Sequence, residues 1–277
     1  MADWAVGLST GCLSSMRFVD SLEVVRKAGF DMVEVCSLPQ HLDYHDESAL
    51  QGAALKLEEL WMEAHSFHAP FAPDIDITSP ERARRNAARD EIQRAAAAAA
   101  ILGTKYFILH PGPETGEIPR TERMGRMGNA AGVLEEVAER CRELGVRLVL
   151  ENMLPHLFAG PIRDLLWLLG SLARTDVGIC LDTGHAHLAG DLERVAHKLS
   201  GHLWSIHVND NRNHRDDHLP PGDGAVDWET LLRQLDHGGY RGALILEIAG
   251  SRDTDAVMAA AQRGRQHLRR MARRLDD

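Results

Sequence analysis

The chain has 277 residues, of which 44% are hydrophobic and 26% are charged, a balance typical of a globular protein with a sizeable core. Its 41 acidic residues against 31 basic ones give a formal net charge of −10, which provides no overall attraction to nucleic acid or to anionic lipid. No apolar run approaches the roughly 20 residues of a membrane-spanning helix, and residues 1–17 lack the pattern of a signal peptide. We therefore expect a cytoplasmic protein with no membrane partner, reduced cysteines, and nucleic acid disfavoured as a partner.

Short apolar segments rich in β-forming residues recur along the whole chain, each followed by a polar loop. We expect strands at 4–9, 31–36, 64–70, 105–112, 147–153, 177–185, 203–210 and 243–250. Helical spacing between them predicts helices at 19–30, 48–64, 81–103 and 129–145, and the alanine run 95–100 fits close packing within the third of these. Eight such units predict parallel strands in a closed (β/α)8 barrel, a TIM barrel that forms one domain over residues 1–277.

Polar residues end almost every predicted strand, where a (β/α)8 barrel builds its active site. In chain order they are Glu34, His68, His110, Glu151, Asp182 with His185, His207 with Asp210, and Glu247. Any one of these histidines, taken alone, is more often a structural residue than a ligand. The convergence of seven strand ends on one axis favours a shared site. The segment 220–228, rich in proline and glycine, is expected to be a functional loop rather than a domain boundary.

Buried carboxylates need compensation, and the chain offers few cations to provide it. Glu151 and Glu247 lie in the apolar segments LVLENM and LILEIAG, where an unpaired carboxylate is costly to bury. From the fourth strand onward the only basic strand residues are Lys105 and Arg147, both at the entering ends. A bound metal ion is therefore the expected compensation. Oxygen ligands with one or two imidazoles suit manganese, our first choice, with zinc, cobalt or magnesium as alternatives. Cys180 is expected to be a core residue.

The segments that hold these residues resemble a known family. HAPF, FILHPGP, LVLENM, CLDTGHAHLAGD, IHVNDNRNHRDDHLPPGDGAVDW and LILEIAG follow one another as they do in the xylose-isomerase-like TIM barrels. This superfamily holds sugar and sugar-phosphate isomerases and epimerases together with endonuclease IV, the apurinic-site nuclease. The resemblance covers nearly the whole chain.

The resemblance implies a set of ligands. Glu151, Asp182, His207 and Glu247 would hold the divalent metal that the epimerases and the nuclease share, and His185 would contact the substrate. In the nuclease branch His68 and His110 help hold a second zinc, and His185 holds a third with an Asp-x-His pair. That pair is matched here by Asp216 and His218.

Departures from the nuclease pattern favour the sugar branch. The chain has ENMLPHLFAG and HPGPETG where the nuclease carries ENTAGQG-like and HPGS-like segments. Its segments STGCLSS and VEVCSLPQHLDYHD also resemble those of sugar isomerases. In this branch we expect His185, His68, His110 and Arg215 to bind the substrate. An exposed surface turn is the alternative reading for Arg215 and Asp210.

The expected enzyme is a metal-dependent isomerase or epimerase of a sugar, sugar phosphate or related keto-acid. Glu151 and Glu247 would be the acid and base that move a proton beside the carbonyl of an enediolate. An apurinic-site nuclease with several zinc ions is the first alternative, and a sugar-binding barrel subunit without catalysis is the second. The substrate, its phosphorylation, the choice between isomerisation and epimerisation, and the number of subunits, a homo-oligomer included, stay open.

Overall fold

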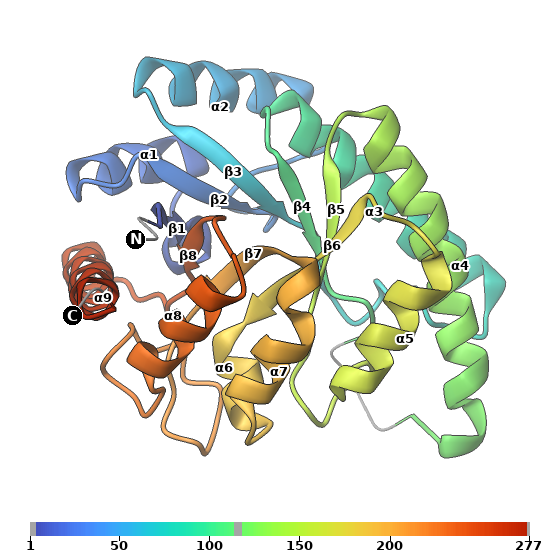
Figure 1. Cartoon of the computed structure of the whole chain (residues 1–277). Helices are drawn as coiled ribbons and strands as arrows, with labels where there is room; N and C mark the ends of the chain where they lie inside the picture. Colours follow the sequence, from blue (N-terminus) through green and yellow to red (C-terminus); the bar gives the residue numbers. More distant parts are fainter. Residues whose placement is uncertain (1–3, 114–117, 276–277) are drawn as a thin grey trace.

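The computed structural model describes residues 4–113 and 118–275, and it forms a closed barrel of eight parallel strands (Figure 1). The strands are β1 (Val6–Ser9), β2 (Met32–Cys36), β3 (Glu63–His68), β4 (Tyr106–Leu109), β5 (Arg147–Glu151), β6 (Val177–Asp182), β7 (Leu203–Val208) and β8 (Leu244–Leu246). They pair in sequence order, and β8 pairs with β1 to close the barrel, with Val6 opposite Leu244. The (β/α)8 fold predicted from the sequence is confirmed.

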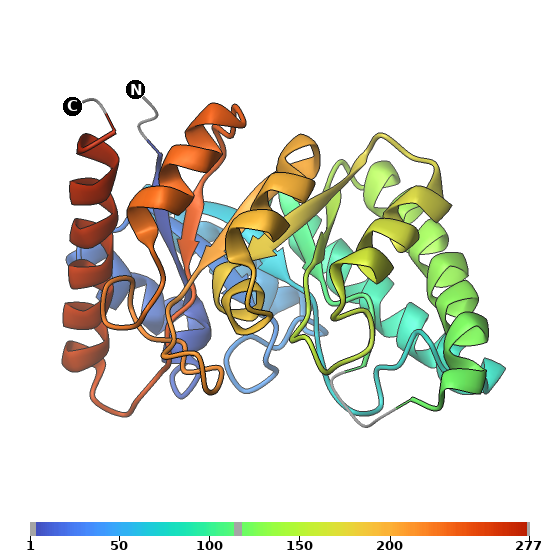
Figure 2. The ribbon, with the colours of Figure 1, turned by 60° about the horizontal axis from the view of Figure 1, so that its bottom comes forward.

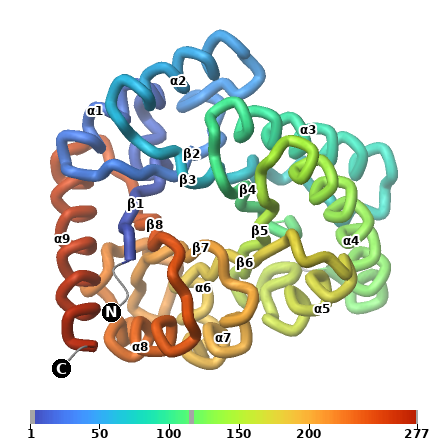
Figure 3. Tube along the Cα trace, turned by 45° about the horizontal axis from the view of Figure 1, so that its top comes forward, coloured from blue at the N-terminus to red at the C-terminus, as the bar shows by residue number. Residues whose placement is uncertain are grey.

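Helices surround the strands on the outside of the barrel (Figure 3). They are α1 (Phe18–Lys27), α2 (Glu47–Glu59), α3 (Arg82–Ile101), α4 (Arg120–Glu143), α5 (Ile162–Leu172), α6 (Thr183–Leu188), α7 (Leu192–Leu199), α8 (Trp228–His237) and α9 (Thr254–Arg273), with short 3₁₀ turns at Thr10–Leu13 and Ser200–His202. Figure 2 shows α9 and α4 at opposite sides with the barrel strands between them. Among the helices of the described residues, none combines the length and the hydropathy needed to cross a membrane.

Several element boundaries differ from those predicted. The helix predicted at 48–64 ends at Glu59, because Trp61 has a positive φ of 54° and reverses the chain into β3. The helix predicted at 129–145 begins earlier, at Arg120. The strand predicted at 177–185 ends at Asp182, whose side chain caps α6 by accepting a hydrogen bond from the His185 N–H. His185 is therefore a helical residue.

The pleat of the strands separates two buried clusters. Residues such as Phe67 and Phe107 point outward into the large apolar layer between strands and helices. Tyr106, Val149 and Cys180 point inward and fill the barrel, so Cys180 is a core residue, as predicted. Four alanines of the run 95–100 are buried in α3, which confirms the predicted close packing.

The same pleat brings the polar residues to one end of the barrel interior. Two residues beyond inward-facing Val149 comes Glu151, and two beyond Cys180 comes Asp182. His207 follows buried Ser205 in the same way. In each of these strands, an inward-facing apolar or small residue is thus followed, at the strand's end, by an inward-facing residue that can bind a metal ion. The inward-facing polar ends form the floor of the site.

Candidate metal centre

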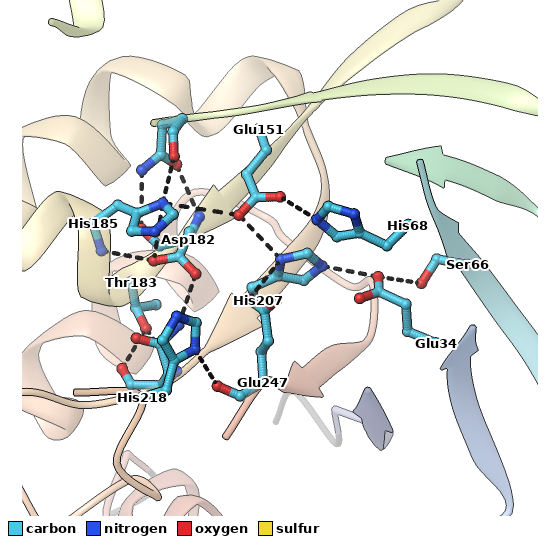
Figure 4. Close-up of polar contacts among 12 residues, drawn as sticks. Glu34, Ser66, His68, Glu151, Asp182, Thr183, His185, His207, His218 and Glu247 are labelled. Atoms are coloured by element: carbon cyan, nitrogen blue, oxygen red, sulfur yellow. Dashed lines mark hydrogen bonds and ion pairs between the residues drawn. The ribbon is translucent and has the colours of Figure 1, made fainter. Parts of the chain in front are cut away.

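Four side chains meet on this floor, and we call them the main centre: Glu151, Asp182, His207 and Glu247 (Figure 4). Each offers one ligand atom, and these atoms all lie within 4.8 Å of one another. Nδ1 of His207 is 3.3 Å from Oε1 of Glu151 and 3.2 Å from Oε2 of Glu247. His207 and Asp182 are fully buried, whereas the Glu247 side chain is 23% exposed.

Two further groups of ligand types adjoin the main centre. The second cluster consists of His68, His110 and Glu151, in which Nε2 of each histidine lies 3.3–3.4 Å from Oε2 of the carboxylate. The third cluster consists of His185, Asp216 and His218. Glu151 therefore belongs to two groups, because its Oε1 faces His207 and its Oε2 faces the second cluster.

The orientation of four histidine rings tests whether a metal ion fits. In each ring, one nitrogen is hydrogen-bonded to a carbonyl or carboxylate oxygen. The pairs are His68 with Ala69 O, His185 with Asn152 O, His218 with Glu247 O, and His207 with the Glu34 carboxylate. The other nitrogen of each ring points toward carboxylate oxygens of the three groups. This arrangement, in which one nitrogen is anchored and the other is presented, is usual for histidines that bind metals.

Unpaired buried atoms point to the same conclusion. Nδ1 of His207 and Oε2 of Glu247 are buried, and among the described residues neither makes a hydrogen bond. Buried polar atoms are normally satisfied, so atoms that face one another without hydrogen bonds suggest a missing partner. The donors are nitrogen and oxygen only, which suits manganese, magnesium, cobalt or zinc. The residues present thus fit a divalent cation.

Two residues behind the main centre hold its ligands. The Glu34 carboxylate on β2 accepts hydrogen bonds from Ser66 Oγ at 2.7 Å and from His207 Nε2 at 2.9 Å. Because a carboxylate only accepts, Nε2 of His207 carries the hydrogen, and in the neutral ring Nδ1 keeps its lone pair. Asn209 donates to Oδ2 of Asp182 at 2.7 Å. An added Cβ on Gly184 would lie 1.9 Å from Asn209 Oδ1, so this approach requires glycine.

The charges of the site are strongly coupled. Burial favours the neutral form of Glu151, but His207 and His110 outweigh it and hold the pKa of that carboxyl well below its usual value. Burial raises the pKa of Asp182 to about 6, with His185 opposing the rise. Burial also favours the neutral form of the Glu247 carboxyl, but the neighbouring His207 outweighs this effect and lowers the pKa to about 2. Burial opposes the charged form of His218, yet its bond to Asp216 raises the pKa to about 10.

These shifts predict that metal binding releases protons. Folding raises the pKa of His218 from 6.5 to about 10, so its contribution to the stability of the metal-free protein is complete below pH 6.5 and is lost as pH rises through about 10. The pKa of His207 and that of His185 are raised as well, through neighbouring carboxylates that outweigh burial. A cation at the main centre must displace the proton of His207, so its affinity should rise about tenfold per pH unit for each proton displaced. Further cations in the third cluster would displace those of His185 and His218.

Calorimetry in two buffers of different ionisation enthalpy, at pH 6.5 and pH 8, measures this release. Equal binding enthalpies in both buffers together with an affinity that does not change with pH would contradict the prediction. The same titration of the His218→Gln variant serves as a control, because His218 lies outside the main centre and one manganese ion there should release as many protons as in the unaltered protein.

Glu34 supports a second prediction at the main centre. Glu34→Ala should weaken divalent cation binding by about 10- to 100-fold, because His207 loses the acceptor that fixes its ring. Glu34→Gln keeps an acceptor oxygen of the same shape and should lose much less. A titration of manganese against a competing chelator measures both affinities. If Glu34→Ala binds manganese as tightly as the unaltered protein, Glu34 has no role in orienting His207.

A cavity of about 270 Å³, which we call the metal cavity, opens above the three groups. Glu151, Glu247, His185 and His218 line its polar side. Phe71 lies over the second cluster, with its ring centroid 5.3 Å from that of His68, and Leu154 and Leu157 add apolar wall. Among the described residues that line it, none is lysine or arginine.

The structure brings together most of the residues that we expected at the site. Glu151, Asp182, His207, Glu247, His68, His110, His185, Asp216 and His218 all lie in the three groups. Arg215 does not join them, because its side chain is 81% exposed and pairs with Asp217; a substrate contact for Arg215 stays a prediction. We expected Glu34 at a strand end but assigned it no role. Phe71 was not predicted at the site, although it belongs to the HAPF motif. The turn HPGPETG spans residues 110–116, of which 114–116 lie outside the described residues.

Asp210 turns out to be a structural residue. Its buried carboxylate accepts hydrogen bonds from the N–H groups of Gly222 and Val226 and from Nε1 of Trp228. Its backbone pairs with Leu219 in an antiparallel bridge. The loop between β7 and α8, residues 209–227, is thereby closed on itself, and Trp228, the last residue of the predicted loop 220–228, begins α8. This closure positions the segment that carries Asp216 and His218.

Comparisons with known proteins identify the family to which the chain belongs. The family profile described as xylose isomerase-like TIM barrel matches residues 22–271. An uncharacterized protein of Methanocaldococcus jannaschii is 27% identical over 90% of this chain and 87% of its own. A probable endonuclease 4 of Mycobacterium tuberculosis is 26% identical over 79% of this chain and 86% of its own.

Two solved structures share the fold over nearly the full length. A D-tagatose 3-epimerase-like protein superposes with a TM-score of 0.83 and 23% identity, covering 96% of this chain and 98% of that one. An L-ribulose 3-epimerase superposes with a TM-score of 0.81 and 18% identity, covering 98% of this chain and 95% of that one.

Proposed function

The chain belongs to the xylose isomerase-like TIM barrel family, and from this premise we propose that it is a divalent-metal-dependent isomerase or epimerase of a sugar or related keto compound. The observation that carries the proposal is the pair of carboxylates, Glu151 and Glu247, that line one cavity above a metal-ligand floor. The epimerases among the solved structures of this fold support it. We place the protein in the cytoplasm, and we treat residues 1–277 as one domain, as parts of the same proposal.

The two carboxylates would perform the proton transfers. Both pKa values lie below the usual range, so both groups are ionised at neutral pH and either can accept a proton from the carbon beside a carbonyl. Glu151 comes from β5 and Glu247 follows β8, so they approach a substrate between them from different sides. Return of the proton to the opposite side of a planar enediolate gives epimerisation. Return to the neighbouring carbon gives isomerisation.

The two carboxylates differ in their access to water. The Glu151 side chain is 1% exposed, and the Glu247 side chain is 23% exposed. We therefore assign to Glu247 the exchange of protons with solvent. When bound, a divalent ion at the main centre supplies polarisation of the carbonyl, which acidifies the neighbouring carbon.

Other residues would bind the substrate. His185 presents a ring nitrogen on the wall of the metal cavity and is placed to orient a hydroxyl group. Phe71 and Leu157 supply apolar surface for the carbon skeleton. The lack of lysine and arginine among the described lining residues favours a substrate whose reacting part is uncharged rather than a phosphorylated one.

Hydrogen exchange with solvent tests the proposal. A panel of ketoses, aldoses and their phosphates is incubated in deuterated water with the manganese-loaded protein, and proton NMR follows the carbon beside the carbonyl. We expect deuterium at that position for at least one unphosphorylated sugar. Exchange with none of the panel would contradict the proposal.

The second and third clusters favour one other function, an apurinic-site nuclease. Hydrolysis of a phosphodiester by several metal ions requires additional ligand groups beside the main centre, and both clusters supply them. The similarity to a probable endonuclease 4 supports the same alternative. A duplex with one abasic site provides the assay. Metal-dependent cleavage of this duplex without deuterium exchange in any sugar would replace the isomerase proposal.

A further inference from the structure

A second cavity of about 310 Å³ adjoins the metal cavity. It lies between the loop that follows β5 and the helices α6 and α7, and we call it the α7 cavity. The residues of the β5 loop divide the two spaces: Leu154 and Leu157 face the metal cavity, whereas Pro155 and Pro161 face the α7 cavity. Met153 and His185 line both. No residue of the proposed mechanism other than His185 uses this space.

The inner surface of the α7 cavity is mostly apolar. Ala186 and Val195 are buried side chains of α6 and α7, and the wall is completed by Met153 of the β5 loop and Ile162 at the start of α5. Burial of a ligand's carbon skeleton against an apolar surface of this kind removes both from water and is favourable. The α7 cavity is therefore suited to the apolar part of a small molecule.

Two positively charged side chains line the same cavity. Arg194 and Lys198 lie one turn apart on α7, so their side chains extend from the same face of the helix. Arg194 is 3.2 Å from Asp191, and Lys198 has no carboxylate partner among the residues that the structure describes. The charge at the rim thus stays net positive, with two cations against one carboxylate. The metal cavity differs, because no lysine or arginine lines it among the described residues.

From this combination we propose that the α7 cavity is a binding site for a small anion with an apolar body, such as an aryl or alkyl phosphate, sulfonate or carboxylate. The apolar body packs against Met153, Ile162 and Val195, and the anionic group pairs with Arg194 and Lys198. Such a ligand contacts His185, whose ring also borders the metal cavity. The site goes beyond the proposed function and does not depend on it.

Calorimetric titration with benzenesulfonate tests the site, because a sulfonate coordinates divalent metals poorly. We expect binding by the metal-loaded protein and a loss of about tenfold or more in the double variant Arg194→Gln/Lys198→Gln. The double variant Arg269→Gln/Arg273→Gln is the matched control, since it removes two exposed cations with the same spacing on α9. The control should bind as the unaltered protein does. Benzyl alcohol, of similar size but uncharged, should bind at least tenfold more weakly.

Three results would overturn the site. They are an equal loss in both double variants, equal affinity for benzyl alcohol, and loss of benzenesulfonate binding in Glu247→Gln, which would place the probe in the metal cavity. A further variant, Ala189→Phe at the exposed rim, narrows the cavity without changing charge and should also weaken binding.

Repetition of the titration with a saturating sugar identifies the source of the ligand. Unchanged benzenesulfonate affinity would indicate a separate ligand. Mutual exclusion would indicate that the anionic group belongs to a larger substrate that spans both cavities. Both results keep the anion site, and neither alters the test of the proposed function, which uses hydrogen exchange.

Discussion

Glu247→Gln is expected to reduce deuterium incorporation into the substrate by about 10²- to 10⁴-fold, the usual contribution of a positioned general acid or base. Glutamine preserves the shape of the side chain and one oxygen for a metal ion, but it cannot carry a proton between substrate and water. Because Glu247 is the more exposed of the two carboxylates, the loss should be larger for solvent exchange than for conversion of the sugar itself. Proton NMR in deuterated water measures both rates in one sample.

Two controls separate proton transfer from structural damage. Glu58→Gln changes an exposed glutamate on α2 and should leave both rates unchanged. Manganese affinity of Glu247→Gln, measured in parallel, shows whether the main centre is still loaded. If the loaded variant exchanges deuterium at the rate of the unaltered protein, Glu247 is not the group that exchanges protons with solvent.

The main features of the fold follow from local patterns that are visible in the sequence. Eight apolar segments alternate with helices, and alternate residues of a strand point inward, so Glu151, Asp182 and His207 converge because each ends an inward-facing series. The exact lengths of the segments do not follow, because strand and helix ends depend on turns. Trp61, with its positive φ, ends a stretch whose composition still favours a helix.

The finer arrangement of the site depends on contacts between distant segments. Nothing in the local sequence around Glu34 indicates that it lies 2.9 Å from His207, 173 residues away. Asp210 lies at the end of a strand like the ligands do, yet its neighbours are the N–H groups of its own loop. Asp216 and His218 lie in a loop without periodicity, so only the family resemblance predicted that they join His185.

The shared position of Glu151 leads to the second large expected effect. Its carboxylate contributes Oε1 to the main centre and Oε2 to the second cluster, so Glu151→Gln should impair both groups at once. We expect a loss of about 100-fold or more in manganese affinity, because removal of one charged partner from a buried group costs about 3–5 kcal/mol. Asp182→Asn should have a similar effect on the main centre alone. His218→Gln, in the third cluster, should leave the main centre nearly unchanged.

Metal content per chain, measured by elemental analysis after dialysis against manganese or zinc, distinguishes the two functions that this geometry supports. A proton-transferring enzyme needs only the main centre, so we expect one tightly held manganese ion, which a chelator removes and which is absent from Glu151→Gln. Three zinc ions per chain, falling to one in Glu151→Gln and to two in His218→Gln, would mean that all three groups of ligands are occupied. That pattern, joined to cleavage at an abasic site, would favour hydrolysis. If Glu151→Gln and Asp182→Asn both keep the full metal content and affinity, the ion is not held by the main centre, and the proton transfers assigned to Glu151 and Glu247 lose their basis.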